Sequence, residues 1–304
     1  MTYRITLVSW DRIYFLAFVL GVCALIGCSQ VTEIHYPSPA PTTVAIEFMP
    51  GVVCTDSLEF NGMFSPDGKE FYFSRYEEHD IYVSRFEDGH WGTPVVASFS
   101  HPSFKDCDPA FSPDGNRLYF ISTRPRDEKD VTKDFDIWYV DRKEKGWTEP
   151  ANLEIVNSDS SEYFVSVAGN GNLYFASART GGYSSFDIYK SVFQSGEYTV
   201  PVNLGPGIND QHLDHDPWVS PDERFIIFTS VDRPAGLGRG DLYISRYRED
   251  QWTMAINLGP RVNTVLYEFA PCLTSDGKYL FFSRKDQIEW IATDGLAVGP
   301  DDNH

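Results

Sequence analysis

The stretch Phe64-Ser65-Pro66-Asp67-Gly68 decides the fold, because it returns along the chain in a regular series. Proline presets the first corner of a tight turn, aspartate bonds its own backbone, and glycine accepts a positive φ. An identical copy of this turn lies at residues 111–115, and altered copies lie at residues 167–171, 219–223 and 273–277. Five copies of one turn indicate a repeat protein.

Two further segments accompany each turn. An aromatic run such as Phe71-Tyr72-Phe73 follows it and is typical of a strand buried on both faces. The next run opens with an aspartate in four copies, at Asp80, Asp136, Asp187 and Asp241. We expect a last strand around the aromatic residue that comes next, at Trp91, Trp147, Tyr198 and Trp252. Four strands at a period of about 50 residues are typical of a β-propeller blade.

The fifth unit lacks its last strand, since the chain runs out after residues 287–291. A matching segment lies near the other end, where residues 46–53 resemble residues 256–263, and both precede a repeat turn. We therefore expect an N-terminal strand to complete the last blade, which closes the ring and removes two open sheet edges. The sequence predicts an all-β, five-bladed β-propeller. Six blades would follow if the N-terminal strands formed a blade of their own.

The first residues are typical of an export signal. Arg4 and Arg12 precede an apolar run at residues 13–26, which is too short to span a membrane. The run ends on Leu25-Ile26-Gly27-Cys28, which resembles the lipobox of bacterial lipoproteins and implies that Cys28 carries lipid. By the same resemblance, Ser29 after the cysteine implies sorting to the outer membrane. The alternative is ordinary secretory cleavage, with Cys28 incidental.

A proline-rich stretch follows Cys28. Pro37, Pro39 and Pro41 alternate among small residues, which favours an extended tether. The sequence therefore predicts a lipoprotein signal peptide at residues 1–27, a tether at residues 28–43 and the propeller at residues 44–304. The expected location is the bacterial cell envelope, with the lipid anchor in the outer membrane and the propeller facing the periplasm.

The charge balance restricts the partners. The chain has 25 basic and 44 acidic residues and a net charge of −19. Such a surface repels nucleic acid and anionic lipid heads, so contact with the membrane is expected through the lipid anchor alone. Outside the signal and Cys28 there are three cysteines, Cys54, Cys107 and Cys272, which we interpret as buried thiols, with one disulfide as the alternative.

Each repeat carries one acid six residues before the serine position of its turn, and one arginine just after its aromatic strand. Antiparallel neighbours place the start of one strand beside the end of the next, so each acid should meet its arginine. The aspartate that opens the third strand should join them, because an arginine fork can hold two carboxylates. The acids are Glu59, Asp106, Glu162, Asp214 and Glu268, and the arginines are Arg75, Arg124, Arg179, Arg233 and Arg284.

This candidate ring has two interpretations. It is either an architectural staple at the channel mouth or a polar funnel that binds a ligand. Hydrolysis of glycans would require two carboxylates free of arginine. Each ring acid has its own arginine, which should lower its pKa and spoil it as a general acid. A catalytic ring is therefore the weaker hypothesis.

Metal and cofactor signals are sparse. Alternation along residues 210–216 places His212, Asp214 and Asp216 on one side and His215 on the other, which makes the first three weak metal candidates. No known ligand spacing is met, so a solvated loop is the alternative. The insertion at residues 124–135 lacks the central glycine of a calcium loop and is interpreted as a charged surface loop. No phosphate-binding glycine loop, paired zinc cysteines or nucleophile triad is legible, and no cofactor is expected.

The turn, the aromatic strand and the Asp-Ile-Tyr strand together resemble the Pro-Asp β-propeller repeats of the TolB-like family, distant relatives of WD-repeat propellers. The resemblance covers residues 44–293. It departs from the pattern at residues 167–171, which lack Pro-Asp, and at Gln287, where the family usually has aspartate. It implies an envelope interaction module and seldom an enzyme.

The expected function follows from the resemblance and the ring. We expect a monomeric, non-catalytic module that binds an envelope protein, a polysaccharide or peptidoglycan through its channel mouth. The alternative is a carbohydrate-active or other hydrolytic enzyme that uses inner-strand carboxylates.

Overall fold

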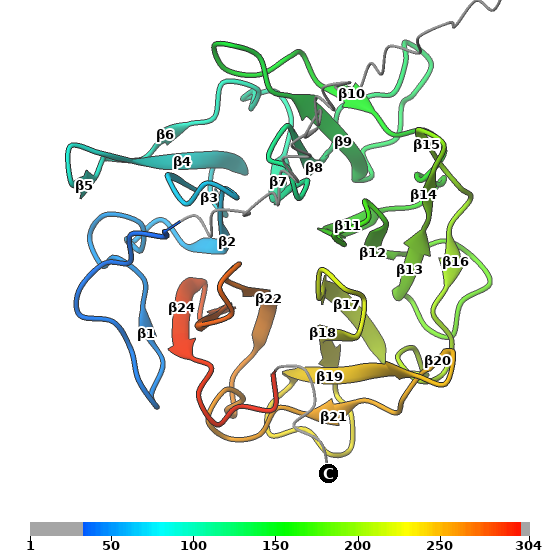
Figure 1. Ribbon diagram of the computed structural model, residues 1–304. Helices are drawn as coiled ribbons and strands as arrows, with labels where there is room; N and C mark the ends of the chain where they lie inside the picture. The colour runs from blue at the N-terminus through cyan, green and yellow to red at the C-terminus, as the bar shows by residue number, and fades with distance from the viewer. Residues whose placement is uncertain (1–32, 299–304) are drawn as a thin grey trace, which may run out of the picture. The chain divides into compact units, whose positions relative to one another are not determined.

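The computed structural model describes residues 33–298, and every regular element in this range is a β-strand. Figure 1 shows the strands gathered into five sheets around a central axis, which is the arrangement of a five-bladed propeller. The five-bladed prediction is confirmed, and the N-terminal strands form no sixth blade. Within residues 33–298, no helix has the length and apolar character needed to cross a membrane.

Each blade is an antiparallel sheet whose four strands follow one another from the axis outward. Blade one has β2 (Glu59–Phe64), β3 (Glu70–Arg75), β4 (Asp80–Glu87) and β6 (Val95–Val96). Blade two has β7 (Asp106–Phe111), β8 (Arg117–Ser122), β9 (Asp136–Asp141) and β10 (Ala151–Asn152). Blade three has β11 (Glu162–Val167), β12 (Leu173–Ser177), β13 (Asp187–Ser191) and β16 (Val202–Asn203). Blade four has β17 (Leu213–Val219), β18 (Phe225–Val231), β19 (Gly240–Arg248) and β21 (Ile256–Asn257), and blade five has β22 (Glu268–Leu273), β23 (Tyr279–Arg284), β24 (Gln287–Ala292) and β1 (Ile46–Glu47).

The N-terminal strand closes the ring as predicted. Ile46 in β1 pairs with Trp290 in β24, and Figure 1 shows the blue strand beside the red one. Phe48 follows β1 and is fully buried, with its ring centroid 4.4 Å from that of Phe71 and 4.9 Å from that of Phe281. One aromatic side chain therefore joins blade one to blade five.

Strands are present at Trp91, Tyr198 and Trp252 as expected, but they are not the outermost strands of their blades. Each of these aromatic residues lies instead in a short hairpin at the end of the third strand. The hairpin strands are β5 (His90–Trp91), β14 (Phe193–Gln194), β15 (Glu197–Tyr198) and β20 (Gln251–Trp252), while Trp147 forms an isolated bridge with Arg142. The true fourth strand comes a few residues later in each blade.

Packing between blades explains this difference. Trp147 Nε1 donates to Tyr72 Oη at 3.2 Å, so blade two reaches blade one. The hydroxyls of Tyr198 and Tyr119 lie 2.6 Å apart, which joins blade three to blade two. The hairpins thus pack against the preceding blade. There a large amphipathic ring can bury its apolar face and still form a hydrogen bond through its polar atom.

Each inner strand carries a β-bulge two residues after its ring acid. The register with the second strand shifts there in all five blades. The residue at this position has a positive φ although none is glycine, and the five are Asn61, Asp108, Phe164, Asp216 and Ala270. Such bulges re-aim side chains, so these positions decide what faces the channel.

The first described residues lie on the face that carries the repeat turns, which we call the turn face. Ile34 is buried beside Gly68, and Tyr36 Oη donates to Asp276 Oδ1 at 2.8 Å. Part of the expected tether is therefore packed on blades one and five. Residues 1–27 and Cys28 lie outside the described residues, so the division into signal peptide, tether and propeller stays a prediction.

Candidate functional site

All five ring acids meet their arginines, as expected from the repeat. The closest contacts are 3.1 Å for Arg75–Glu59, 2.5 Å for Arg124–Asp106, 3.2 Å for Arg179–Glu162, 3.1 Å for Arg233–Asp214 and 3.6 Å for Arg284–Glu268. Every one of these acids has no exposed surface.

The ring pairs also hold the backbone. Arg179 Nη2 donates to the carbonyl oxygen of Val156 at 2.7 Å, in the segment that leads into the inner strand. Glu162 accepts from the backbone nitrogen of Ser158 at 3.1 Å in the same segment. The pair therefore joins the end of the second strand to the entry of the first, which is an architectural role.

The expected lowering of ring-acid pKa values is wrong in three blades. Burial raises the pKa of Asp214 to about 6, and this outweighs the charge of Arg233. Burial also raises the pKa values of Asp106 and Glu162 above their usual range, against the opposing effects of Arg124 and Arg179. Desolvation of a carboxylate disfavours its charged form, and here that cost exceeds the attraction of the paired cation.

The third-strand aspartates do not join the ring arginines as expected. Asp187 accepts from the backbone nitrogen of Tyr183 at 2.6 Å and from Asn203 Nδ2 at 2.8 Å. Asp241 is bound in the same way by the preceding loop and by Asn257. These aspartates fasten the loop before the third strand to the fourth strand. In blade five, where Gln287 replaces the aspartate, Arg284 pairs with Glu289 instead.

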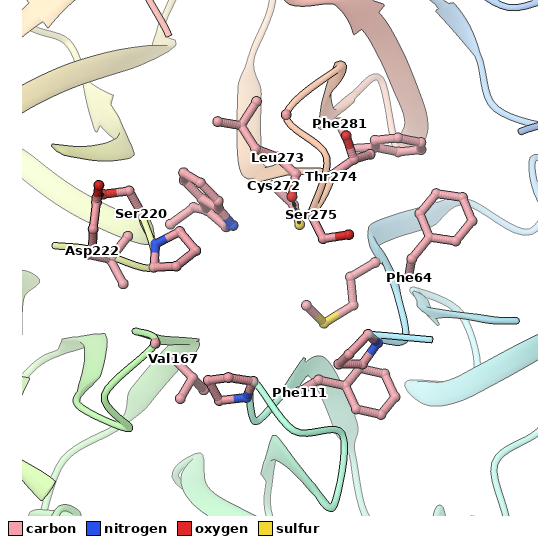
Figure 2. Close-up of a pocket in the computed structure, with 18 of the residues that line it drawn as sticks. Phe64, Phe111, Val167, Ser220, Asp222, Cys272, Leu273, Thr274, Ser275 and Phe281 are labelled. Carbon is pink, nitrogen blue, oxygen red and sulfur yellow. Dashed lines mark hydrogen bonds between the residues drawn. The ribbon is translucent and has the colours of Figure 1, made fainter. Parts of the chain in front are cut away.

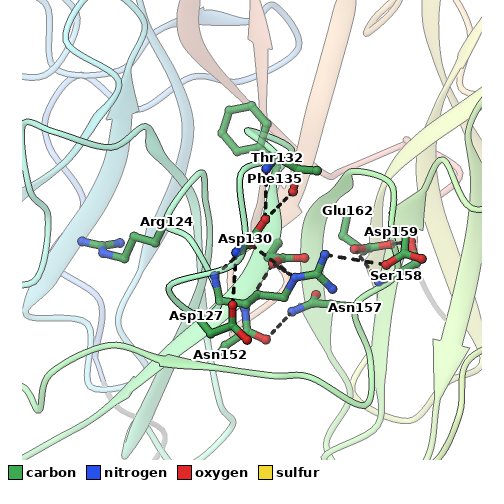
Figure 3. A network of polar contacts seen from close by, with 12 residues as sticks. Arg124, Asp127, Asp130, Thr132, Phe135, Asn152, Asn157, Ser158, Asp159 and Glu162 are labelled. Atoms are coloured by element: carbon green, nitrogen blue, oxygen red, sulfur yellow. Dashed lines mark hydrogen bonds and ion pairs between the residues drawn. The ribbon is translucent and has the colours of Figure 1, made fainter.

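Arg126 organises the long insertion of blade two. Its Nε lies 3.2 Å from Asp136 Oδ2, and its backbone nitrogen donates to Asp130 Oδ2 at 2.9 Å. Figure 3 shows Asp130 also contacting Thr132, so one carboxylate closes the loop on itself. Within residues 33–298, no three histidine, cysteine, aspartate or glutamate side chains are grouped closely enough to hold a metal ion.

The three weak metal candidates are not brought together. His212 Nδ1 lies 2.7 Å from Asp210 Oδ1, while Asp214 belongs to the ring with Arg233. Asp216 pairs with His215 Nδ1 at 2.9 Å, so the expected separation of His215 from Asp216 is wrong. The cause is the bulge, because simple alternation fails once Asp216 adopts a positive φ.

A cavity of about 490 Å³ opens on the channel at the end of the blades where the ring lies, and we call it the mouth pocket. All five blades contribute to it. Its lining includes Phe60, Tyr76, His79, Lys105, Asp108, Phe135, Tyr163, Phe186, His215, Asp216, Tyr267 and Phe269.

Aromatic rings form most of the pocket wall. Phe269 lies with its ring centroid 6.3 Å from Phe60 on one side and 5.7 Å from Tyr267 on the other. Across the pocket, Tyr163 lies 5.1 Å from Phe135 and 5.2 Å from Phe186. Partly exposed aromatic rings in a concave site are suited to stacking on a ligand.

Two carboxylates of the bulge positions line the same pocket. Asp108 and Asp216 are 6% and 7% exposed, and within residues 33–298 neither forms an ion pair with an arginine or lysine. Asp108 Oδ1 accepts from Asn61 Nδ2 at 3.1 Å, and Asp216 Oδ2 accepts from the backbone nitrogen of Ala270 at 3.1 Å. These bonds also link neighbouring blades around the channel.

Burial and the charge of Asp216 raise the pKa of Asp108 to about 7. Burial lowers the pKa of His215, but the neighbouring Asp216 outweighs it, so the net shift is upward. His215 Nε2 lies 2.8 Å from Tyr267 Oη, which fixes the ring orientation. The mouth pocket thus holds two buried carboxylates beside one imidazole, and the pKa of Asp108 is raised to about 7.

The sequence analysis did not single out Asp108 or the aromatic wall, and it named Asp216 only as a weak metal candidate. The available signal was the repeat position two residues after each ring acid, where Asn61, Asp108 and Asp216 are polar residues inside otherwise apolar strands. Without knowledge of the bulge this position is not informative, because simple alternation places its side chain on the same side of the strand as the ring acid.

A second cavity, of about 580 Å³, lies at the turn face. Figure 2 shows Phe64, Phe111, Val167 and Leu273 around it, and its lining is mainly apolar. Trp218, which follows Pro217, is half-buried and lines this cavity rather than the mouth pocket.

No family model matches this chain, and no curated protein matches it. Among solved structures, TolB from Agrobacterium tumefaciens is similar with a TM-score of 0.54 and 18% identity, covering 79% of this chain and 79% of that one. TolB from Acinetobacter baumannii is similar with a TM-score of 0.51 and 18% identity.

The fold is TolB-like. The match covers 76% of this chain and 53% of the Acinetobacter protein, so this chain corresponds to about half of that protein's length. A gluconolactonase from Xanthomonas campestris is similar with a TM-score of 0.46 and 10% identity, covering 75% of this chain and 70% of that one. At 18% identity the two TolB comparisons describe the fold alone, and activity has to be argued from the site.

Proposed function

We propose that this chain is a lipid-anchored lipoprotein of the bacterial cell envelope, related to the TolB-like family, whose propeller is a non-catalytic binding module. Its partner is an envelope protein or an envelope polymer such as peptidoglycan. The observation that carries the proposal is the mouth pocket, a concave site of about 490 Å³ with aromatic walls and buried acids. Concave sites with aromatic walls and few polar groups are the usual form of ligand sites.

The ring favours binding over catalysis. Each ring acid is enclosed and held by its arginine and by backbone donors, as for Glu59 with Arg75 and Thr55. Such acids have no room to exchange a proton with a substrate. The ring therefore supports the rim of the pocket, while the aromatic walls supply the contact surface.

The position of the pocket suits an anchored protein. The described chain begins on the turn face, where Ile34 and Tyr36 are fixed to the repeat turns. The mouth pocket lies at the opposite end of the blades. The described residues that are nearest to Cys28 in the sequence therefore lie at the other end of the blades from the mouth pocket, which leaves the pocket open to partners.

A site-directed crosslinking experiment tests this proposal. A photoreactive phenylalanine analogue replaces Tyr76, which is 55% exposed at the pocket rim, in the full chain within intact envelopes. We expect one partner to be captured on illumination. The matched control places the same analogue at Tyr247, a 44% exposed aromatic residue outside the mouth pocket.

Capture from Tyr76 and not from Tyr247 would support the binding module. Equal capture from both positions, or none from Tyr76, would contradict it. The Lys105→Glu variant, which changes an exposed lining residue, should weaken capture from Tyr76 without changing the unfolding midpoint.

A hydrolytic enzyme is the second candidate, because Asp108 and Asp216 are inner-strand carboxylates without an arginine. The raised pKa of Asp108, about 7, is that of a general acid at neutral pH. Sustained release of product from a polysaccharide, abolished by Asp108→Asn, would establish this candidate. Absence of turnover together with crosslinking from Tyr76 would reject it.

A further inference from the structure

The charges that line the mouth pocket do not balance. Asp108 and Asp216 are both buried, and Nδ1 of His215 lies 2.9 Å from Oδ1 of Asp216. The side-chain partner of Asp108 is the neutral amide of Asn61. With His215 protonated, two carboxylates share one positive charge.

An uncompensated buried carboxylate is costly and tends to take up a proton. The upward shift of the pKa of Asp108, to about 7, has this origin in burial and in the charge of Asp216. A cation placed beside Asp108 would replace that proton. The two carboxylates of the pocket therefore have one cationic partner between them, and a second cation is missing.

The other groups on the wall do not supply this second cation. Lys105 lines the pocket but is exposed to solvent, and within residues 33–298 no ion pair joins it to Asp108 or Asp216. Burial lowers the pKa of His79, so this imidazole is neutral at pH 7. The remaining wall is uncharged and largely aromatic, with Phe60, Phe269 and Tyr267 in one continuous row. Aromatic faces attract organic cations, most strongly where water is excluded.

We infer that the mouth pocket binds one organic monocation, a primary ammonium or a guanidinium group, between its aromatic walls, with Asp108 and Asp216 as the counter-charge. The inference rests on the proposed function and names the chemistry by which that site recognises its ligand. The cationic group belongs either to a free amine or to a basic side chain of a partner protein. A volume of about 490 Å³ admits both.

Calorimetry on the full chain in detergent tests the inference. The free-amine probe is benzylamine, and its neutral counterpart of the same shape is benzyl alcohol. The side-chain probe is Nα-acetyl-lysine amide, and its neutral counterpart is Nα-acetyl-norleucine amide. We expect at least one cation to bind tenfold or more tightly than its counterpart at pH 7, and the tighter of the two cations identifies the source. Equal affinities within both pairs would overturn the inference.

A pair of variants locates the charge. Asp108→Asn keeps an acceptor for Asn61 but removes the counter-charge, so the preference for the cation should fall about tenfold while binding of the neutral probe stays unchanged. Glu144→Gln removes an exposed carboxylate outside the pocket and should leave both affinities unchanged. A preference that persists in Asp108→Asn would overturn the assignment.

Proton release gives a readout that does not depend on a variant that folds. Binding measured in buffers of different ionisation enthalpy should release a fraction of a proton at pH 7 with benzylamine and none with benzyl alcohol, because the cation displaces the proton of Asp108. Absence of proton release on cation binding would contradict the role of Asp108.

Competition separates this inference from the proposed function. Saturating benzylamine should abolish photocrosslinking from Tyr76. Capture that persists unchanged would leave the binding module standing and overturn the cation site. Calorimetric binding of a cation without any captured partner would support the cation site and contradict the envelope-binding role.

Discussion

Arg179 donates from Nη2 to Oε1 of Glu162 across 3.2 Å, and the same nitrogen donates to the carbonyl oxygen of Val156 at 2.7 Å. The acid is fully buried and the arginine side chain is 16% exposed. One guanidinium therefore holds both the inner strand of blade three and the segment that leads into it. The four other ring pairs repeat the ion pair.

Arg179→Ala should lower the free energy of unfolding by about 3 kcal/mol, because it leaves Glu162 as a buried carboxylate without its cation. Urea unfolding measures the loss. Lys145→Ala, which removes an exposed charge, should change stability by less than about 0.5 kcal/mol. A loss as small for Arg179→Ala as for the control would show that the ring is not architectural.

Phe48→Ala should destabilise the propeller by about 4 kcal/mol, because Phe48 fills the space between Phe71 and Phe281 where the ring closes. Val44→Ala, at a position 70% exposed, provides the matched control and should be neutral. Thermal unfolding followed by tryptophan fluorescence compares the two. Similar midpoints for Phe48→Ala and wild type would contradict the closing role of this segment.

Stability should fall as the pH rises from about 4 to about 7, and Asp108 contributes to this slope. Its pKa is about 7 in the fold against an ordinary value of 3.8, so the folded state holds the proton more tightly. The stabilising contribution is complete below about pH 4, is lost as the pH rises through 7, and changes no further above it. The slope is at most about 1.4 kcal/mol per pH unit.

Asp108→Asn should flatten this slope when urea unfolding is measured at pH 5, 6, 7 and 8. The neighbouring Asp216 raises the pKa of His215, so part of the pH dependence should remain in the variant. An unchanged slope would show that Asp108 is ionised throughout this range.

Cys28→Ala should abolish incorporation of labelled palmitate and move the protein from the detergent phase to the aqueous phase on cloud-point partition. A Cys23→Ala variant, which changes a cysteine inside the proposed signal, should keep the label. Labelling that survives Cys28→Ala would contradict lipid attachment at this cysteine.

The ring could be predicted from the sequence because it depends only on position within the repeat. Glu268 and Arg284 follow the same count as Glu59 and Arg75, so antiparallel pairing alone brings each acid to its arginine. Ring closure was predictable for a similar reason. The segment around Ile46 reads like that around Ile256, and both form outer strands.

The mouth pocket could not be predicted because it depends on the bulges. Two-residue periodicity assigns Asp214 and Asp216 to one side, whereas the positive φ of Asp216 brings it to His215. A bulge depends on how backbone groups of neighbouring strands pair, which a single strand does not encode. Trp147 was misplaced for a comparable reason, since its partner Tyr72 lies in another blade.

The pairing of Ile46 with Trp290 has a consequence for how the protein is made. A ribosome releases the chain from its N-terminus, so β1 emerges early and has no sheet to join until β24 is synthesised. Blades one to four can assemble in order from the N-terminal side, but blade five cannot. Contacts between distant parts of a sequence form slowly, so we expect ring closure to follow the formation of the first four blades. A nascent chain stalled before β24 would be an open arc with its outermost strand still free.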